Sequence, residues 1–215
     1  MKVYLSHMTR HHFSFKEAFL FGWTKTKQHY WFCILTFIMV TLIINSIGHV
    51  PLLRTIVSLM AALSVVSVSL LISRDHHFTF ENLFSPLLSP KKVIKFLIVS
   101  VLYSVPVILA AVFLYFVPAK IIGLIIVVPS VYLAVRLKFF PYVVIENEDA
   151  SIKSLFEMSF KLTKGHFWML FVFLLLVSML NVLGAALMIV GLMVTVPVSI
   201  FATAYVYNRL KEHTV

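Results

Sequence analysis

The feature of this sequence that most limits its fold is a series of six apolar runs, each close to the length of a membrane-spanning helix. They cover residues 30–47, 52–73, 96–117, 119–140, 167–190 and 191–208. A helix needs about 20 apolar residues to cross the hydrocarbon core of a bilayer. Only 12% of the 215 residues are charged, whereas a soluble domain has about 25%. We therefore predict an all-α, polytopic membrane protein with six transmembrane helices in one integral membrane domain, residues 1–215.

The positions of lysine and arginine predict the orientation of these helices. Of the 18 such residues, all but Arg54 and Lys120 lie before the first run, after the last run, in the connection after the second run, or in the connection after the fourth run, counted here with the end of that run at Arg136 and Lys138. The other three connections are very short turns, marked by Gly48, Pro118 and Gly191. Positively charged connections stay in the cytoplasm, so we expect both termini there. The same flanking positions account for the net charge of +10 by attraction to anionic lipid head groups, without a nucleic-acid partner.

The sequence also contains an internal repeat. A shift of 137 positions aligns seven identical residues between segments 14–31 and 151–168, namely Ser14/Ser151, Lys16/Lys153, Phe19/Phe156, Thr26/Thr163, Lys27/Lys164, His29/His166 and Trp31/Trp168. A shift of 65 aligns the segment around His11 with the segment around His76. Self-similarity at a fixed spacing indicates repeated structural units. We predict three repeats, approximately 11–73, 76–140 and 148–211, each with an amphipathic interfacial helix followed by a transmembrane hairpin.

The amphipathic helix is clearest in the third repeat, from Ser151 to Lys164. Its charged residues recur at helical spacing and form one stripe, made of Lys153, Glu157, Lys161 and Lys164. Its opposite face is apolar and consists of Ile152, Leu155, Phe156, Phe160 and Leu162. Ser14, Thr79 and Ser151 are expected to cap the three amphipathic segments, with Glu17 completing a capping box with Ser14. We expect these helices to lie in the inner leaflet, apolar face toward the acyl chains and basic face toward the head groups.

Several polar residues are candidates for binding or anchoring. Arg136, Lys138, Glu146, Lys153, Lys161 and Lys164 are expected to bind lipid head groups or a partner at the cytoplasmic surface. Arg136 either extends to the head groups or points into the bundle, where it would hold a lipid phosphate or pair with Glu146. Trp23, His29, Trp31, His166 and Trp168 are expected to anchor the chain at the membrane interface. Asn45 and Asn181 occupy almost equivalent repeat positions and are expected to form hydrogen bonds between helices.

Other kinds of site are not favoured. None of the eight carboxylates lies well inside an apolar run, which argues against a proton relay. The histidine pairs at His11 and His76 lack a third ligand at suitable spacing for a metal. Cys33 is the only cysteine, and no known catalytic motif is present. We therefore expect no metal, no cofactor and no enzymatic activity.

The segment from Arg136 to Trp168 resembles a family of bacterial membrane proteins. The resemblance rests on Arg136–Pro141, on Val144, Ile145 and Glu146, and on Ser159, Leu162, Thr163, Lys164, Gly165 and Trp168. The family comprises the uncharacterised six-helix proteins of the YciC type and the related membrane domain fused to some glycerophosphodiester phosphodiesterases. It implies a multi-pass protein of the bacterial inner (cytoplasmic) membrane. The fusion implies a link to lipid metabolism, although the membrane part is not the catalyst there.

These features together favour a non-enzymatic membrane protein that supports the envelope by binding phospholipid or a membrane partner at the inner leaflet. The membrane partner could be another membrane protein or a second copy of this chain. Two alternatives stay open. The internal repeat and the prolines within the runs are compatible with a transporter of small solutes or lipids. Arg136, Lys138 and Glu146 around a cleft would instead indicate a membrane-embedded lipid-modifying enzyme.

Overall fold

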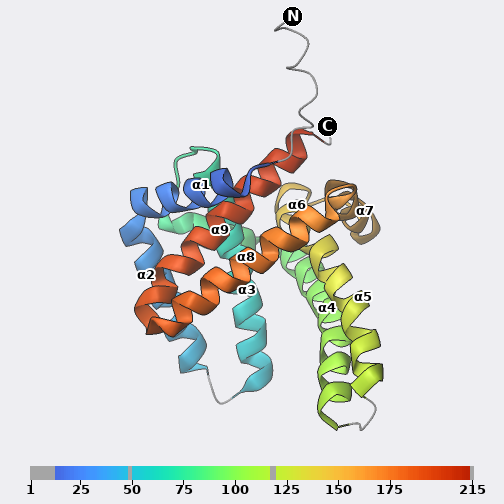
Figure 1. Cartoon of the computed structure of the whole chain (residues 1–215). Helices are drawn as coiled ribbons and strands as arrows, with labels where there is room; N and C mark the ends of the chain where they lie inside the picture. Colours follow the sequence, from blue (N-terminus) through green and yellow to red (C-terminus); the bar gives the residue numbers. More distant parts are fainter. Residues whose placement is uncertain (1–12, 48–49, 117–119, 214–215) are drawn as a thin grey trace, which may run out of the picture.

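The computed structural model describes residues 13–47, 50–116 and 120–213, and the regular secondary structure in these ranges is helical, as predicted (Figure 1). The helices are α1 (Phe15–Gln28), α2 (Tyr30–Ser46), α3 (Pro51–Ser73), α4 (Pro90–Phe116), α5 (Lys120–Leu137), α6 (Phe140–Glu146), α7 (Ile152–Thr163), α8 (Phe167–Ala186) and α9 (Met188–Glu212). Two short 3-10 helices, η1 (Phe80–Leu83) and η2 (Ser85–Leu88), connect α3 to α4.

Four segments of the described chain are long and apolar enough to cross a membrane. They are Pro51–Ser73, Val127–Glu146, Phe167–Ala186 and Val190–Glu212. A fifth results if α1 and α2, which meet at an angle of 87°, form one broken span. A helix of 20 residues is about 30 Å long, which matches the hydrocarbon core. A multi-pass membrane protein is therefore plausible, whereas six crossings and the cytoplasmic orientation stay predictions.

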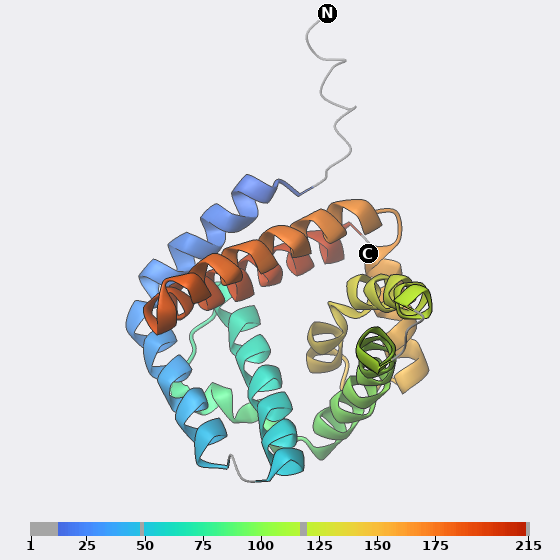
Figure 2. The same ribbon diagram turned by 60° about the horizontal axis from the view of Figure 1, so that its bottom comes forward.

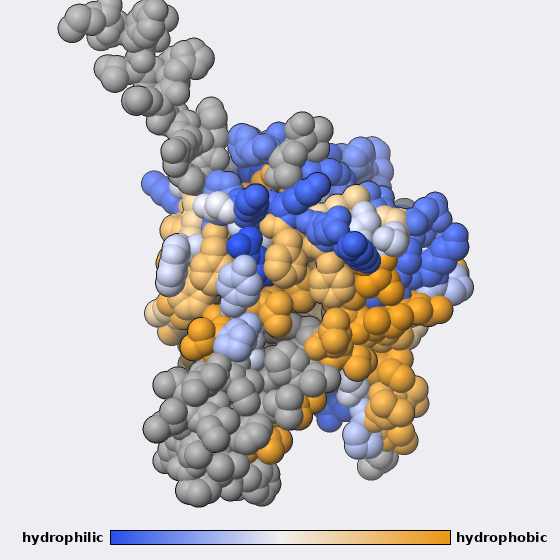
Figure 3. All heavy atoms as spheres, turned by 90° about the vertical axis from the view of Figure 1, so that its right-hand side faces the viewer, coloured by the Kyte–Doolittle hydropathy of each residue, from blue (hydrophilic) through white to orange (hydrophobic). Residues whose placement is uncertain are grey.

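The polar and apolar parts of the molecule are separated along its long direction. In Figure 1, α1, α6, α7 and the C-terminal end of α9 lie at one end. Figure 3 shows hydrophilic residues gathered at this polar end, above an apolar flank. Large apolar side chains of α4, α5 and α8 are exposed, among them Leu102, Val128 and Leu175. Such a band of exposed apolar surface is expected where lipid surrounds the protein.

The long helices are arranged as pairs. The α2–α3 and α4–α5 pairs stand on different sides of the molecule, while α8 lies along α9 (Figure 2). The short elements pack on the long helices and on each other: α1 packs on α9, η1 and η2 pack on α3, and α7 packs on α5 and α6. The start residues of α7, α8 and α9 follow those of α1, α2 and α3 by the same 137 positions, as in Phe15 and Ile152.

Helix α1 approaches α9 closely because residue 22 is a glycine. A Cβ atom on Gly22 would lie 2.4 Å from the carbonyl oxygen of Val198 and 3.1 Å from the backbone nitrogen of Ala202. Real Cβ atoms do not come this near to backbone atoms, so a side chain at this position would push α1 away. Gly22 thus allows the first amphipathic helix to dock on the last helix of the chain.

The helix α6 is a difference from the sequence prediction, which extended the fourth apolar run to residue 140. Helix α5 ends at Leu137 although the apolar sequence continues, and the short helix α6 starts at Phe140 with Pro141 in its first turn. Proline is tolerated there because the first amides of a helix have no intrahelical acceptor. Phe140 and Val144 are almost fully buried, in a core cluster that includes Phe173 and Tyr207. Helix α6 contacts α3, α4 and α7 and thereby joins them.

The predicted helix caps are present only in part. The Ser151 hydroxyl accepts a hydrogen bond from the backbone N–H of Ser154, at 3.2 Å. Thr79 forms a capping box with Asn82, whose side-chain oxygen accepts from the Thr79 N–H at 2.6 Å. The cap predicted for Ser14 is wrong, since its side chain makes no capping bond. The Glu17 carboxylate instead accepts from the Tyr205 hydroxyl at 3.3 Å, which links α1 to α9.

Candidate functional site

The basic stripe of α7 faces away from the protein. Lys153, Lys161 and Lys164 are exposed, as is Glu157. The opposite face is covered by protein rather than open to lipid, because Leu155 is completely buried and the ring of Phe156 lies 5.4 Å from that of Phe140. The apolar face of α7 thus packs on α5 and α6. This corrects the expectation that it inserts among acyl chains and leaves the lysines as its available surface.

Arg136 lies between α5 and α7. Its Nη1 donates to Thr163 Oγ1 at 3.2 Å, and its Nε donates to the Tyr132 hydroxyl at 3.1 Å. The guanidinium carbon is 5.1 Å from the centre of the Tyr132 ring and 5.8 Å from that of Phe160. Arg136 is half-buried by these contacts. The pairing with Glu146 that the sequence allowed is absent from the ion pairs of the described residues, because Arg136 points to α7 instead.

Glu146, at the end of α6, is the centre of a polar cluster that the sequence did not predict. Its Oε1 accepts from Arg74 Nη2 at 2.5 Å, and its Oε2 accepts from the Tyr207 hydroxyl at 2.5 Å and from Lys211 Nζ at 2.7 Å. Its side chain is only 13% exposed. Asn208 extends this cluster, since its side-chain oxygen accepts from Arg74 Nε at 3.1 Å.

The Glu146 cluster connects the C-terminal ends of three helices that are far apart in the sequence. Arg74 directly follows α3, Glu146 ends α6, and Lys211 belongs to the last turn of α9. Arg74 and Lys211 are 137 positions apart, which is the spacing of the repeat predicted from the sequence. Two cations and a buried hydroxyl bond to one carboxylate, which can accept about four hydrogen bonds. This arrangement stabilises the polar end, because each Glu146 oxygen accepts from at least one donor.

The loop after α6 is held by three lysines from the start of α4. Lys95 Nζ donates to the carbonyl oxygens of Glu148 and Ala150, both at 2.6 Å. Lys91 Nζ lies 3.0 Å from Asp149 Oδ1, and Lys92 Nζ lies 3.2 Å from Glu148 Oε2. Bonds from the Ser89 hydroxyl and from Lys92 lower the pKa of the Glu148 carboxyl, while Lys91 lowers the pKa of the Asp149 carboxyl.

The remaining member of the predicted head-group set, Lys138, is exposed in the short break between α5 and α6. Among the contacts of the described residues, none joins Lys138 to Arg136 or to Glu146. The three residues therefore do not form the compact group that a lipid-modifying site would need. Arg136 contacts α7, and Glu146 contacts α3 and α9.

The predicted interface anchors lie at two bends that resemble each other. His29 separates α1 from α2, and His166 precedes α8 with similar backbone angles, φ −117° and −115°. Trp31 and Trp168 are each 74% exposed. Shallow hollows are present at both bends: the α1–α2 elbow is lined by residues 27–32 and the α7–α8 elbow by residues 165–169.

Cations lie beside both elbows. Lys27 lines the first elbow, and its Nζ is 4.9 Å from the ring centre of Trp23, which is itself exposed. Lys164, the residue equivalent to Lys27, is exposed and directly precedes the second elbow. An exposed tryptophan next to a lysine is the combination expected at the level of phospholipid head groups.

The two predicted interhelical asparagines differ in their bonds. Asn181 Nδ2 on α8 donates to the Ser199 hydroxyl on α9 at 3.1 Å. Asn45 Nδ2 donates at 2.8 Å to the carbonyl oxygen of Thr41 on its own helix, α2. Asn45 is exposed near the end of α2, and its side-chain bond to Thr41 stays within that helix. The prediction of an interhelical bond is therefore wrong for Asn45.

A metal centre finds no support in the described part of the chain. Across residues 13–47, 50–116 and 120–213, no three His, Cys, Asp or Glu side chains gather as a metal-binding group would. His76 and His77 are exposed in the loop after α3. His11 and His12 lie outside the described residues.

Comparison of the chain with protein-family models, with curated proteins and with solved structures gave no match.

Proposed function

We propose that this chain is a six-span, non-enzymatic membrane protein of the bacterial cytoplasmic membrane, and that its polar end binds anionic phospholipid head groups. One observation carries the proposal: lysine, histidine and a largely exposed tryptophan recur at two equivalent elbows on the border between the polar end and the apolar flank. A cation beside an interfacial aromatic ring attracts phosphate while the ring stays at the head-group level.

The proposal of six spans rests on three repeats. Helices α1, α2 and α3 have counterparts in α7, α8 and α9 at a constant offset of 137 positions. The packing is also cyclic, since the short element of each proposed repeat contacts the last helices of another one: α1 on α9, η1 and η2 on α3, and α7 on α5 and α6. With two crossings per repeat, the basic elbows fall on one side and the hairpin turns on the other. The basic side would be cytoplasmic.

The packing of the bundle makes transport of polar solutes a weaker proposal. The core between the helices is occupied by buried side chains such as Phe139, Phe140, Phe173 and Tyr207. Two hollows between the helices, one beside Cys33 and one beside Met39, have apolar linings, in contrast to the polar midplane sites of many transporters. The alternative of a lipid-modifying enzyme requires Arg136, Lys138 and Glu146 around one cleft. Arg136 contacts α7 and Glu146 contacts α3 and α9, so this alternative is also the weaker proposal. The proposed kinship with the YciC-type family is compatible with this role.

Head-group binding by α7 can be tested through Trp168. We would keep Trp168 as the only tryptophan, by Trp23→Phe and Trp31→Phe, and reconstitute the protein in nanodiscs. Brominated phosphatidylglycerol or brominated phosphatidylcholine would be added at equal mole fraction. Each lysine near an anionic surface contributes about 1 kcal/mol of attraction at low salt. We expect stronger fluorescence quenching by the anionic lipid, and weaker preference as salt is raised.

Charge reversal supplies the decisive comparison. The triple variant Lys153→Glu, Lys161→Glu, Lys164→Glu should abolish the preference for the anionic lipid. The matched control replaces the same three lysines with arginine and should keep it. Equal quenching by both lipids in the native sequence, or an unchanged preference after charge reversal, would refute the proposed role of this surface.

A further inference from the structure

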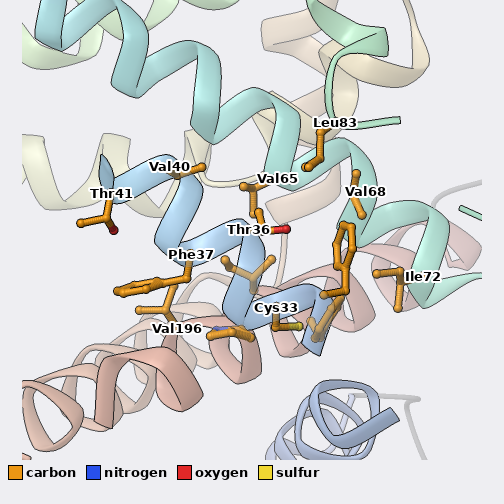
Figure 4. Close-up of a pocket in the computed structure, with 14 residues that line it drawn as sticks. Cys33, Thr36, Phe37, Val40, Thr41, Val65, Val68, Ile72, Leu83 and Val196 are labelled. Atoms are coloured by element: carbon orange, nitrogen blue, oxygen red, sulfur yellow. The ribbon is translucent and has the colours of Figure 1, made fainter. Parts of the chain in front are cut away.

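An apolar cavity of about 230 Å³ lies between α2, α3 and α9. Figure 4 shows its lining, which includes Cys33 and Thr36 of α2, Val65 and Val68 of α3, and Val196 of α9. The cavity is larger than the roughly 150 Å³ apolar cavity that can hold a benzene ring. It lies along the first part of α2, next to the α1–α2 elbow, and can accommodate a length of hydrocarbon chain.

One polar group in this cavity has no partner among the described residues. Thr36 is only 8% exposed, and its Oγ1 makes no hydrogen bond there. Other hydroxyls in these helices donate to the carbonyl oxygen four residues earlier, as Thr26 does to Gly22 at 2.8 Å and Ser64 does to Met60 at 3.0 Å. Figure 4 shows Thr36 among the apolar side chains that line the cavity. A buried hydroxyl in this state is suited to donate to an acceptor on a ligand.

The third repeat has no such opening at the equivalent place. The residues 137 positions after Cys33 and Thr36 are Leu170 and Phe173, which are 1% and 0% exposed. The Phe173 ring lies 5.7 Å from the ring of Phe13. Bulky side chains thus fill the position in α8, whereas the small Cys33 and Thr36 leave space in α2. The cavity beside Cys33 and Thr36 is therefore not reproduced at the equivalent residues of α8.

The cavity adjoins a basic hollow. Phe32 lines both the cavity and the α1–α2 elbow, so the two spaces are neighbours at this residue. The elbow carries Lys27 and His29 and has no carboxylate among its lining residues. From His29 to Thr36 the distance along α2 is about 10 Å, at 1.5 Å per residue. An apolar cavity, a hydroxyl donor and a cation therefore follow one another from the inside of the span to its end.

We infer that this site binds one anionic glycerophospholipid, with an acyl chain in the cavity and the phosphate beside Lys27 and His29. The Thr36 hydroxyl donates to an ester carbonyl oxygen of the lipid. The inference rests on the proposed membrane function but concerns a single retained lipid, and α7 is not involved. The order of groups along α2 matches the order of chain, ester and phosphate in the lipid.

Cys33 gives a direct probe of occupancy, because it is the only cysteine and it lines the cavity. We would measure its alkylation by N-ethylmaleimide in delipidated, detergent-solubilised protein, with and without added phosphatidylglycerol. At ten times the Kd, occupancy should slow alkylation about tenfold. Thr36→Val should weaken the protection about five- to tenfold in Kd, through loss of one hydrogen bond. Lys27→Glu should also weaken it.

Two controls separate this inference from the wider proposal. Charge reversal of Lys153, Lys161 and Lys164 should leave the protection of Cys33 unchanged, so either idea can fail without the other. The double variant Cys33→Leu, Thr36→Phe copies the third repeat and should remove the retained phosphatidylglycerol that native mass spectrometry detects on the native chain. Alkylation that phosphatidylglycerol does not slow, or that phosphatidylcholine slows equally, would overturn the assignment, as would unaltered protection in the Thr36→Val protein.

Discussion

Removal of the Glu146 carboxylate is expected to destabilise the fold more than neutralisation of the exposed Asp149. In Glu146→Ala, the cations of Arg74 and Lys211 lose their shared counter-charge, and the buried Tyr207 hydroxyl loses its acceptor. Breaking a fully buried ion pair costs roughly 3–5 kcal/mol. Here Arg74 and Lys211 are 34% and 43% exposed, so solvent offsets part of the loss. We expect a loss of about 2–3 kcal/mol.

Thermal unfolding in mild detergent, followed by tryptophan fluorescence, measures this effect. For a chain of this length, 1 kcal/mol corresponds to roughly 2–4 °C in Tm, so Glu146→Ala should lower Tm by about 5–10 °C. The matched control is Asp149→Asn, because Asp149 and its partner Lys91 are 88% and 66% exposed. That change should shift Tm by about 2 °C or less. Equal Tm values for the two variants would refute the assigned role of Glu146.

A thermodynamic cycle would show whether the effect comes from the pairing itself. Arg74→Gln should be costly in the native background, where Glu146 loses one of its cations. The same change should cost much less in the Glu146→Ala background, where the pairing is already absent. Coupled residues in one network typically show interaction energies of about 0.5–3 kcal/mol. Additive effects would mean that the two side chains stabilise the protein independently.

Three further predictions concern other contacts of the polar end. Gly22→Leu should undock α1 from α9 and make α1 sensitive to limited proteolysis, whereas an intact α1 would contradict the close approach described above. Thr163→Val removes a bond from Arg136 and should cost about 1 kcal/mol, seen as a fall in Tm of roughly 2–4 °C; an unchanged Tm would contradict it. The pKa values of Glu148 and Asp149 are lowered by their bonds to Ser89, Lys92 and Lys91. Their stabilisation is therefore fully present at neutral pH and is lost only as pH falls below the ordinary pKa of a carboxyl group, about 4. Hydrogen exchange of residues 147–151, corrected for intrinsic rates, should therefore be constant from pH 7 to 5 and rise below pH 4; a rise already at pH 6 would contradict this assignment.

The long helices were the most predictable part of the structure. Helices α2 and α8 begin at Tyr30 and Phe167, the residues at which the first and fifth apolar runs begin. Continuous apolar sequence of this length can satisfy its backbone in lipid only as a helix. The start of α6 was less predictable, since the apolar sequence continues through Phe139 and Phe140 while the helix is interrupted. The steric effect of Pro141 was the available signal for that break.

The amphipathic pattern of α7 predicted a buried face but not what buries it. The helical spacing of the apolar residues indicates that Leu155 and Leu162 are shielded from water, and either lipid or protein can shield them. The answer depends on where α5 and α6 lie, which is a property of the tertiary fold. Arg136 illustrates the same limit, because its partner Thr163 is 27 residues away. The repeat and the family resemblance both marked Thr163, but neither indicated that its hydroxyl bonds to Arg136.

The Glu146 cluster joins residues from three distant segments, which local patterns do not reveal. The repeat did contain part of the signal, since Arg74 and Lys211 are cations at equivalent positions. Comparison of the repeats could have identified this pair. Their common partner Glu146 lies on α6, and among the described residues no similar short helix directly follows α3. The cavity at Thr36 could have been suspected in the same way, from its replacement by Phe173 in the third repeat.

The central claim, six crossings with the elbows on the inner side, is tested most directly by labelling single cysteines in cells. In a Cys33→Ala background, cysteines would replace Arg54, Lys120, Val190, Asp149 or Glu212, one at a time. A membrane-impermeant maleimide should label positions 54, 120 and 190 in intact cells, and positions 149 and 212 only after permeabilisation. Labelling of positions 120 and 149 from the same side would contradict the six-span account.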